Sequence, residues 1–142
     1  MQSADDFLHL LIARTARELS RAFDRSLAAA GGSLPTWRVL LALDGAEHRT
    51  QAELATAVGI RQPTLTHHLD GLERDGLVVR ERDPSNRRAV QVSVTESGRQ
   101  LFLRLRRIAA AFDGRLRAGL ADDEVARLRG VLAQLEENAG PD

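Results

Sequence analysis

Histidines and acidic clusters are the first side chains to test for catalysis or metal binding. The histidines, His9, His48, His67 and His68, are spread over three segments, and no pair combines a ligand spacing with nearby carboxylates. The acidic run at 122–124 is better explained as the first turn of a helix, where carboxylates interact favourably with the helix dipole. No nucleophile elbow, glycine-rich phosphate loop or cysteine is present. These patterns argue against an enzyme, a metal site and a bound cofactor.

Arginine supplies all twenty basic side chains of the chain, and Arg87 and Arg88 are adjacent. The guanidinium is a planar fork of donors that matches phosphate oxygens and the edge of guanine. The pair follows a run of turn formers, 83–86, between segments in which apolar and polar residues alternate. An arginine beside a hairpin tip can reach the minor groove of DNA, where narrow A·T-rich segments attract it. Two simpler explanations stay open: solvated arginines that pack on the hairpin, and GC-rich codons that favour arginine over lysine.

A second polar group lies on a helix predicted over 61–75. Leu65, Leu69 and Leu72 recur at spacings of four and three, which predicts the buried face of this helix. At about 100° per residue, polar side chains fall opposite and beside this stripe, where we expect them to face a major groove. This candidate DNA-contacting set comprises Arg61, Gln62, Thr64, Thr66, His67 and Arg74. An ordinary solvated face is the alternative, and His68, nearer the stripe, is expected to pack partly buried.

Periodicity and terminal signals predict the elements that hold these residues. A long amphipathic helix is expected over 4–30, with Ser3 as its cap and Asp5 and Asp6 in its first turn. The sequence from Thr50 to Glu53 has the pattern of a capping box and opens a short helix. The remaining predictions are helices over 35–43, 50–58, 61–75, 95–120 and 122–137, and a β-hairpin with strands over 77–82 and 90–94.

Composition places the chain among globular proteins. It has 142 residues, of which 43% are hydrophobic and 4% aromatic, so its core must be mainly leucine, valine and alanine. No apolar run approaches 18 residues and the first residues lack a basic flank, so we expect a soluble, cytoplasmic protein without a membrane span. Twenty acidic residues balance the twenty arginines, which is unusual for a nucleic-acid binder, although binding requires only a local basic patch.

Two short helices followed by a hairpin form the order of a winged helix-turn-helix, and the motifs resemble those of the MarR family. The segment 33–40 (SLPTWRVL) is similar to the second-helix region of these regulators, and 51–58 (QAELATAV) to their third helix. The segment 61–78 resembles their recognition helix and its exit. The sequence 82–89 (RDPSNRRA), together with 92–98, resembles their wing and the start of the next helix. The likeness extends over nearly the whole chain, and the wing motif is its most specific part.

The resemblance implies a mainly α fold, a winged helix-turn-helix with N- and C-terminal dimerisation helices and one β-hairpin wing. The implied divisions are 1–34 for the N-terminal dimerisation helix, 35–95 for the DNA-binding domain and 96–142 for the C-terminal dimerisation helices. The implied function is that of a homodimeric, ligand-responsive transcriptional repressor on a pseudo-palindromic operator in double-stranded DNA. Helix 61–75 would lie in the major groove and wing 82–89 in the minor groove.

Residue roles also follow from the resemblance. Arg88 matches the minor-groove arginine of the family, with Arg87 beside it, and Asp83 and Asn86 support the wing. Asn86 stands where the family usually has aspartate, and His67 stands where arginine is common. Both departures concern DNA affinity more than the fold.

A small ligand, often a phenolic or aromatic acid, binds between the dimerisation and DNA-binding parts in such families. Trp37 and Phe112 are the candidates to line such a pocket, and plain core packing is the simpler explanation for both. Because the chain has no cysteine, direct thiol oxidation is excluded as a trigger. The rival functional class is a protein-interaction module, since winged helices also mediate protein contacts and the net charge is zero.

Overall fold

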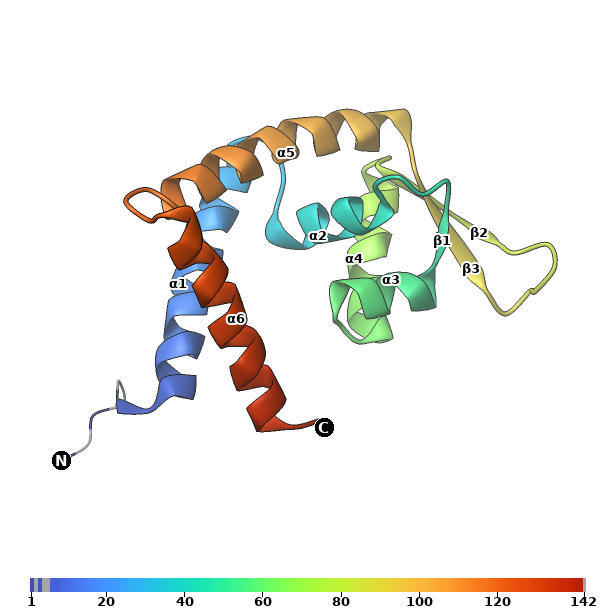
Figure 1. The fold of residues 1–142 in the computed structure, drawn as a ribbon. Helices are drawn as coiled ribbons and strands as arrows, with labels where there is room; N and C mark the ends of the chain where they lie inside the picture. The colour runs from blue at the N-terminus through green and yellow to red at the C-terminus, as the bar shows by residue number, and fades with distance from the viewer. Residues whose placement is uncertain (2, 4–5, 142) are drawn as a thin grey trace. The chain divides into compact units, whose positions relative to one another are not determined.

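The computed structural model describes residues 1, 3 and 6–141, and it confirms a mainly helical fold with a small antiparallel sheet (Figure 1). The chain divides inside its fifth helix into two compact units, Met1–Ala109 and Ala110–Asp142. The divisions expected at residues 34 and 95 stay predictions. The elements are α1 (Leu8–Ala28), α2 (Leu34–Leu43), β1 (Arg49–Thr50), α3 (Gln51–Val58), α4 (Gln62–Arg74), β2 (Val78–Arg82), β3 (Val90–Val94), α5 (Glu96–Leu116) and α6 (Asp122–Ala139).

The core of the first unit consists mainly of aliphatic side chains from α1 to α5 and the sheet, together with Phe102 of α5. The predicted stripe of α4 is confirmed, because Leu65 and Leu69 are fully buried and Leu72 is 5% exposed. Leu54 of α3 and Val92 of β3 are likewise fully buried. Each leucine removed from water in this way contributes about 1.5–3 kcal/mol relative to an exposed one. The burial of these stripes fixes which faces of α3 and α4 remain for solvent.

Two short helices, α3 and α4, form the helix-turn-helix. The Thr50 hydroxyl accepts a hydrogen bond of 3.1 Å from the Glu53 amide, so Thr50 caps α3 as the sequence predicts. Gly59 ends α3 with a φ of +76°, a left-handed conformation that glycine adopts without steric cost. Pro63 lies in the first turn of α4, where a missing amide hydrogen removes no helical hydrogen bond.

The expected start of the first helix is wrong. The amide and carbonyl of Ser3 both bond to Asp6, and α1 begins only at Leu8. Phe7 occupies the N-cap position and makes no side-chain cap hydrogen bond. The expected first-turn residue Asp5 lies outside the described residues.

The hairpin is confirmed, and a third strand joins it. β2 pairs antiparallel with β3 in a register that places Val78 opposite Val94 and Arg82 opposite Val90. β1 pairs with the other edge of β3, with Arg49 opposite Val92, so the strand order is β1-β3-β2. The hairpin projects beyond α3 and α4 as the wing (Figure 1).

The second unit contains the end of α5 and the whole of α6. Among the described residues, α6 buries no side chain fully. Its apolar residues stay at the surface, with Leu128 exposed by 53%, Val131 by 47% and Leu132 by 39%. Exposed apolar residues grouped on one helix mark an interaction surface. None of the described helices combines the length and apolar character needed to cross a membrane.

Candidate nucleic-acid interface

The polar face of α4 lies opposite its buried leucines, as the 3.6-residue period requires. The side chains predicted to contact DNA are mostly exposed on it. The exposed members are Arg61, Gln62, Thr64, His67 and Arg74. His68, expected to pack partly buried, is indeed half-buried, and its ring centroid lies 6.0 Å from that of His67.

Thr66, the remaining member of that set, is half-buried and joins α4 to α3. Its hydroxyl accepts a hydrogen bond of 2.5 Å from Gln51 Nε2 and donates one of 2.9 Å to the Gln62 carbonyl. The hydroxyl is therefore already engaged within the protein, and its predicted DNA contact stays a prediction. Sequence reasoning did not single out Gln51, because the partner lies fifteen residues away in another helix.

The tip of the wing is shaped by its own polar side chains. The Asp83 carboxylate accepts hydrogen bonds of 2.7 Å from the Ser85 hydroxyl and 2.9 Å from the Ser85 amide. These bonds lower the pKa of Asp83 below its usual range. Asn86 Oδ1 accepts a 3.2 Å hydrogen bond from the backbone amide of Arg88, rather than from its guanidinium. Asp83 and Asn86 thus organise the turn that carries the arginine pair.

The wing arginines Arg87 and Arg88 have exposed side chains. Within the part of the chain that the structure describes, neither guanidinium pairs with a carboxylate. A hollow of about 340 Å³ lies between the wing and the starts of α3 and α4. Gln62 of α4 and Arg88 of the wing both line it, together with Thr50, Gln51, Ala52, Asn86, Ala89 and Val90. The structure therefore brings the two predicted contact elements to one continuous surface.

A cluster around Arg80 connects that wing to α4. Arg80 Nη2 donates to Asp70 Oδ1 at 2.6 Å and to Glu73 Oε1 at 3.1 Å, and the Arg80 amide donates to Glu73 Oε2 at 2.9 Å. The amide bond first, and then the guanidinium bond, lower the pKa of Glu73 below its usual range. Sequence reasoning missed Arg80, since nothing in a strand pattern shows which arginine meets two acids on a preceding helix.

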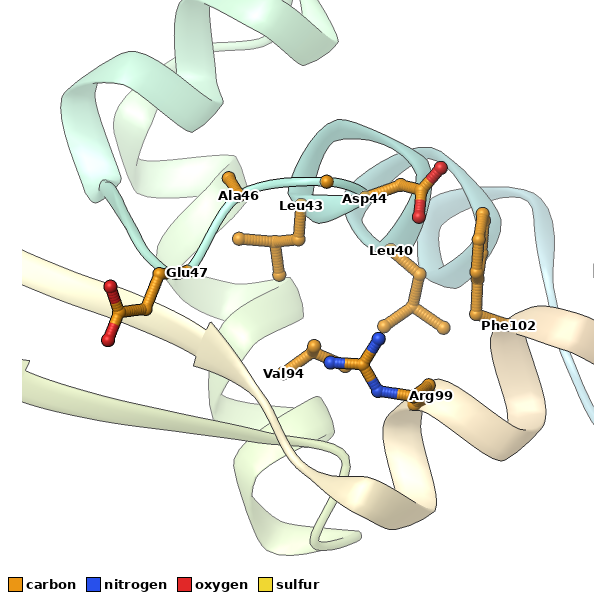
Figure 2. Close-up of a pocket in the computed structure, with 9 residues that line it drawn as sticks. Leu40, Leu43, Asp44, Ala46, Glu47, Val94, Arg99 and Phe102 are labelled. Carbon is orange, nitrogen blue, oxygen red and sulfur yellow. The ribbon is translucent and has the colours of Figure 1, made fainter.

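A second pocket, of about 270 Å³, lies where α2, β3 and α5 meet (Figure 2). Figure 2 shows the Arg99 guanidinium beside Val94 and Leu40. The remaining lining residues are Leu43, Asp44, Gly45, Ala46, Glu47 and Phe102. An apolar floor beneath a few charged groups is typical of small-molecule sites.

The two aromatic residues predicted to line a ligand pocket have separate surroundings. Trp37 packs behind the second pocket, with its ring stacked on that of Phe102 at a centroid distance of 5.5 Å, and it meets Phe23 edge-on. Phe112 belongs to the second unit, where the Arg115 guanidinium lies 5.4 Å from its ring centroid. No group of three or more histidine, aspartate or glutamate side chains suited to a metal occurs among the described residues.

Comparisons with known proteins agree with this geometry. A sequence profile described as the MarR family matches residues 30–89. The transcriptional repressor CouR bound to a 23-mer DNA duplex is 32% identical, with a TM-score of 0.85 over 93% of this chain and 94% of that chain. A MarR-family transcriptional regulator from Rhodococcus sp. RHA1 is 29% identical, with a TM-score of 0.83 over 95% and 96%. CouR from Rhodococcus jostii RHA1 bound to p-coumaroyl-CoA is 29% identical, with a TM-score of 0.81 over 100% and 98%. With its helix-turn-helix and its wing, this chain belongs to the MarR family of DNA-binding transcriptional regulators, which are not enzymes.

Proposed function

We propose that this regulator inserts α4 into the major groove and the wing, residues 82–89, into the adjacent minor groove of its operator. The observation that carries this proposal is the shared hollow of about 340 Å³, which Gln62 and Arg88 both line. The exposed donors Arg61 and Gln62 at the start of α4 suit guanine, adenine or phosphate, and Arg88 suits a narrow minor groove. His67 and Arg74 continue the same exposed face along the helix.

A homodimer on a pseudo-palindromic site completes this mode of binding. Apolar side chains are exposed at the start of α1, where Leu8 is 61% and the N-cap residue Phe7 45% exposed, and on α6, where Leu128 is 53% exposed. A second copy of the chain can cover such faces and gain about 25 cal/mol for each Å² of apolar surface removed from water. The two-fold axis then presents two copies of α4 to successive major grooves, about 34 Å apart. We propose the cytoplasm as the place where this protein acts.

Response to a small effector is the second part of the proposed function, and the pocket in Figure 2 supports it. Phe102 and Leu40 offer apolar surface to an aromatic ring, and Arg99 offers a cation to a carboxylate. A phenolic acid fits this lining, because its carboxylate can meet Arg99 and its hydroxyl can donate to one of the two acids of the pocket, Asp44 and Glu47. The CouR structure with p-coumaroyl-CoA shows that a similar protein binds an aromatic acyl compound. Repression relieved by such a ligand is the expected mode of regulation.

The test compares Arg88→Ala with Arg104→Ala, a matched loss of one exposed arginine from α5. The operator is first obtained by sequencing the fragments that the protein selects from genomic DNA, and affinity is then measured by fluorescence anisotropy at several salt concentrations. We expect Arg88→Ala to weaken operator binding by about 1–3 kcal/mol and to reduce the salt slope, and Arg104→Ala to change neither.

The same salt series separates a DNA-binding regulator from an interaction module. Counterion release from the duplex makes specific binding fall steeply with salt. Binding that is weak, insensitive to salt and unaffected by Arg88→Ala would refute the proposed interface and favour a protein partner.

A further inference from the structure

We infer that Arg80 is a positioning residue of the DNA interface, which fixes the wing relative to α4 without itself contacting DNA. This inference rests on the proposed function, in which α4 and the wing both bind the operator. One side chain from a wing strand holds two acidic side chains of the recognition helix.

The contacts of Arg80 join β2 to successive turns of α4. Its guanidinium bonds to Asp70 at 2.6 Å and to Glu73 at 3.1 Å, and these carboxylates are three residues apart on one face of the helix. Its backbone amide bonds to the second oxygen of Glu73 at 2.9 Å. Both the side chain and the main chain of the strand are therefore tied to the helix.

The connection between α4 and β2 explains why such a tie is needed. Only a short turn separates Arg74 from Val78, and Gly76 in that turn has a φ of +73°. Thr95 holds the turn itself, because its hydroxyl donates to the Gly76 carbonyl at 2.6 Å and its amide to the Leu77 carbonyl at 3.0 Å, but these bonds lie at the base of the hairpin. Beyond it the hairpin extends away from the core, so a small tilt at Gly76 moves Arg88 at the far end by a larger distance. Arg80 follows this turn closely enough to fix the tilt.

The environment of Arg80 separates this cluster from an ordinary surface ion pair. The Arg80 side chain is only 20% exposed, whereas those of Arg21 and Glu18 in a surface pair are each 67% exposed. Exposed pairs contribute little because water and salt screen them and because their long side chains must be ordered. A half-buried guanidinium with two carboxylates and a backbone anchor has a defined geometry.

Charge compensation is the competing explanation for the same cluster. Asp70 and Glu73 lie on the recognition helix with side chains 50% and 40% exposed, so without Arg80 they would repel DNA phosphates. Loss of Arg80 therefore weakens binding under either explanation, through a misplaced wing in the first and through two uncompensated acids in the second. The variants must distinguish them.

The experiment measures operator affinity of the full-length protein for Arg80→Gln, for the triple variant Arg80→Gln, Asp70→Asn, Glu73→Gln, and for each combined with Arg88→Ala. We expect Arg80→Gln to bind about tenfold more weakly and the triple variant, which has no uncompensated acids, to stay close to that value. We also expect Arg88→Ala to cost less in the Arg80→Gln background than in the wild-type protein, because a misplaced wing has already lost part of that contact.

Distinct outcomes overturn the two ideas. Restoration of wild-type affinity by the triple variant, or an Arg88→Ala effect equal in both backgrounds, would refute the positioning role of Arg80. If Arg88→Ala leaves operator affinity unchanged even in the wild-type background, the wing contact of the proposed function is refuted instead. The comparison of Arg80→Gln with the triple variant would still decide between positioning and charge compensation. If the Arg80→Gln variant is unfolded at the temperature of the operator assay, Arg80→Lys provides the second test. Lysine keeps the charge, but its flexible stem does not hold the ammonium as rigidly as the planar guanidinium holds Nη2 between the two carboxylates, so we expect intermediate affinity and a reduced Arg88 effect.

Discussion

Replacement of Gly98 by alanine is expected to destabilise the protein, although helix propensity alone predicts the opposite. Gly98 is buried in the first turn of α5. A Cβ atom at this position would lie 2.1 Å from the Leu77 carbonyl oxygen and 2.7 Å from Val94 Cγ2. The carbonyl cannot easily move, because it accepts a 3.0 Å hydrogen bond from the Thr95 amide. The start of α5 therefore packs backbone to backbone against the segment that leaves α4.

Two opposing terms set the magnitude. Alanine is favoured over glycine in a helix by about 1 kcal/mol. Overpacking of a core position costs about 1–3 kcal/mol, and a clash with backbone rather than a flexible side chain belongs at the upper end. We therefore expect Gly98→Ala to lose about 2 kcal/mol. Gly71→Ala in α4 is the matched control, since no atom lies within 4 Å of its added Cβ, and it should gain up to about 1 kcal/mol.

Urea denaturation at one fixed protein concentration measures both changes, because the stability of a dimer depends on concentration. The expected result is a lower midpoint for Gly98→Ala, a slightly higher midpoint for Gly71→Ala and an unchanged slope for both. A Gly98→Ala midpoint at or above that of the wild-type protein would refute the close approach of α5 to Leu77. Equal changes in the urea midpoint for both substitutions would mean that helix propensity alone determines their effect on stability.

Two further predictions concern titration and assembly. The pKa of Glu73 is lowered in the folded protein. The stability that this carboxylate provides is therefore fully present above its pKa in the unfolded chain, about 4.3, and is lost as the pH falls through its pKa in the folded protein. Thermal melts of Glu73→Gln should show a shallower loss of stability in that acidic range than melts of the wild-type protein. Leu128→Glu should convert a dimer into a monomer in sedimentation experiments at micromolar concentration, and a wild-type protein that is already monomeric would contradict the role assigned to α6.

Local signals explain why much of the DNA-binding unit is predictable from sequence. The leucines at 65, 69 and 72 repeat with a helical period, and their burial fixes the exposed side of α4 without knowledge of any partner. The wing follows from a run of turn formers between alternating segments, and Asp83 and Asn86 bond within that same turn. Each of these features depends on residues only a few positions apart.

Features that depend on distant residues were not predictable. β1 has two residues, too few for an alternation of apolar and polar residues to be recognised. It forms because the edge of β3 that does not face β2 is available for pairing at Gln91 and Val92. Thr66 belongs to the polar side of α4 by helical angle, but the position of Gln51 in α3 directs its hydroxyl inward. Arg80 requires a strand, a turn and a helix to be placed before its carboxylate partners can be identified. In each case tertiary packing, rather than local pattern, selects the contact.

The zero net charge of the chain is compatible with DNA binding, because carboxylates on the candidate interface have partners within the protein whereas the arginines proposed to contact DNA have no carboxylate partner among the described residues. Three of its acidic side chains are engaged within the protein: Asp70 and Glu73 with Arg80, and Asp83 with Ser85. A carboxylate paired with a nearby cation produces a much weaker field at the distance of a phosphate than an isolated one. Among the described residues, the arginines proposed to face DNA have no such carboxylate partner, namely Arg61, Arg74, Arg87 and Arg88. The sum of charges over the sequence counts both groups equally, whereas the DNA responds mainly to the unpaired group.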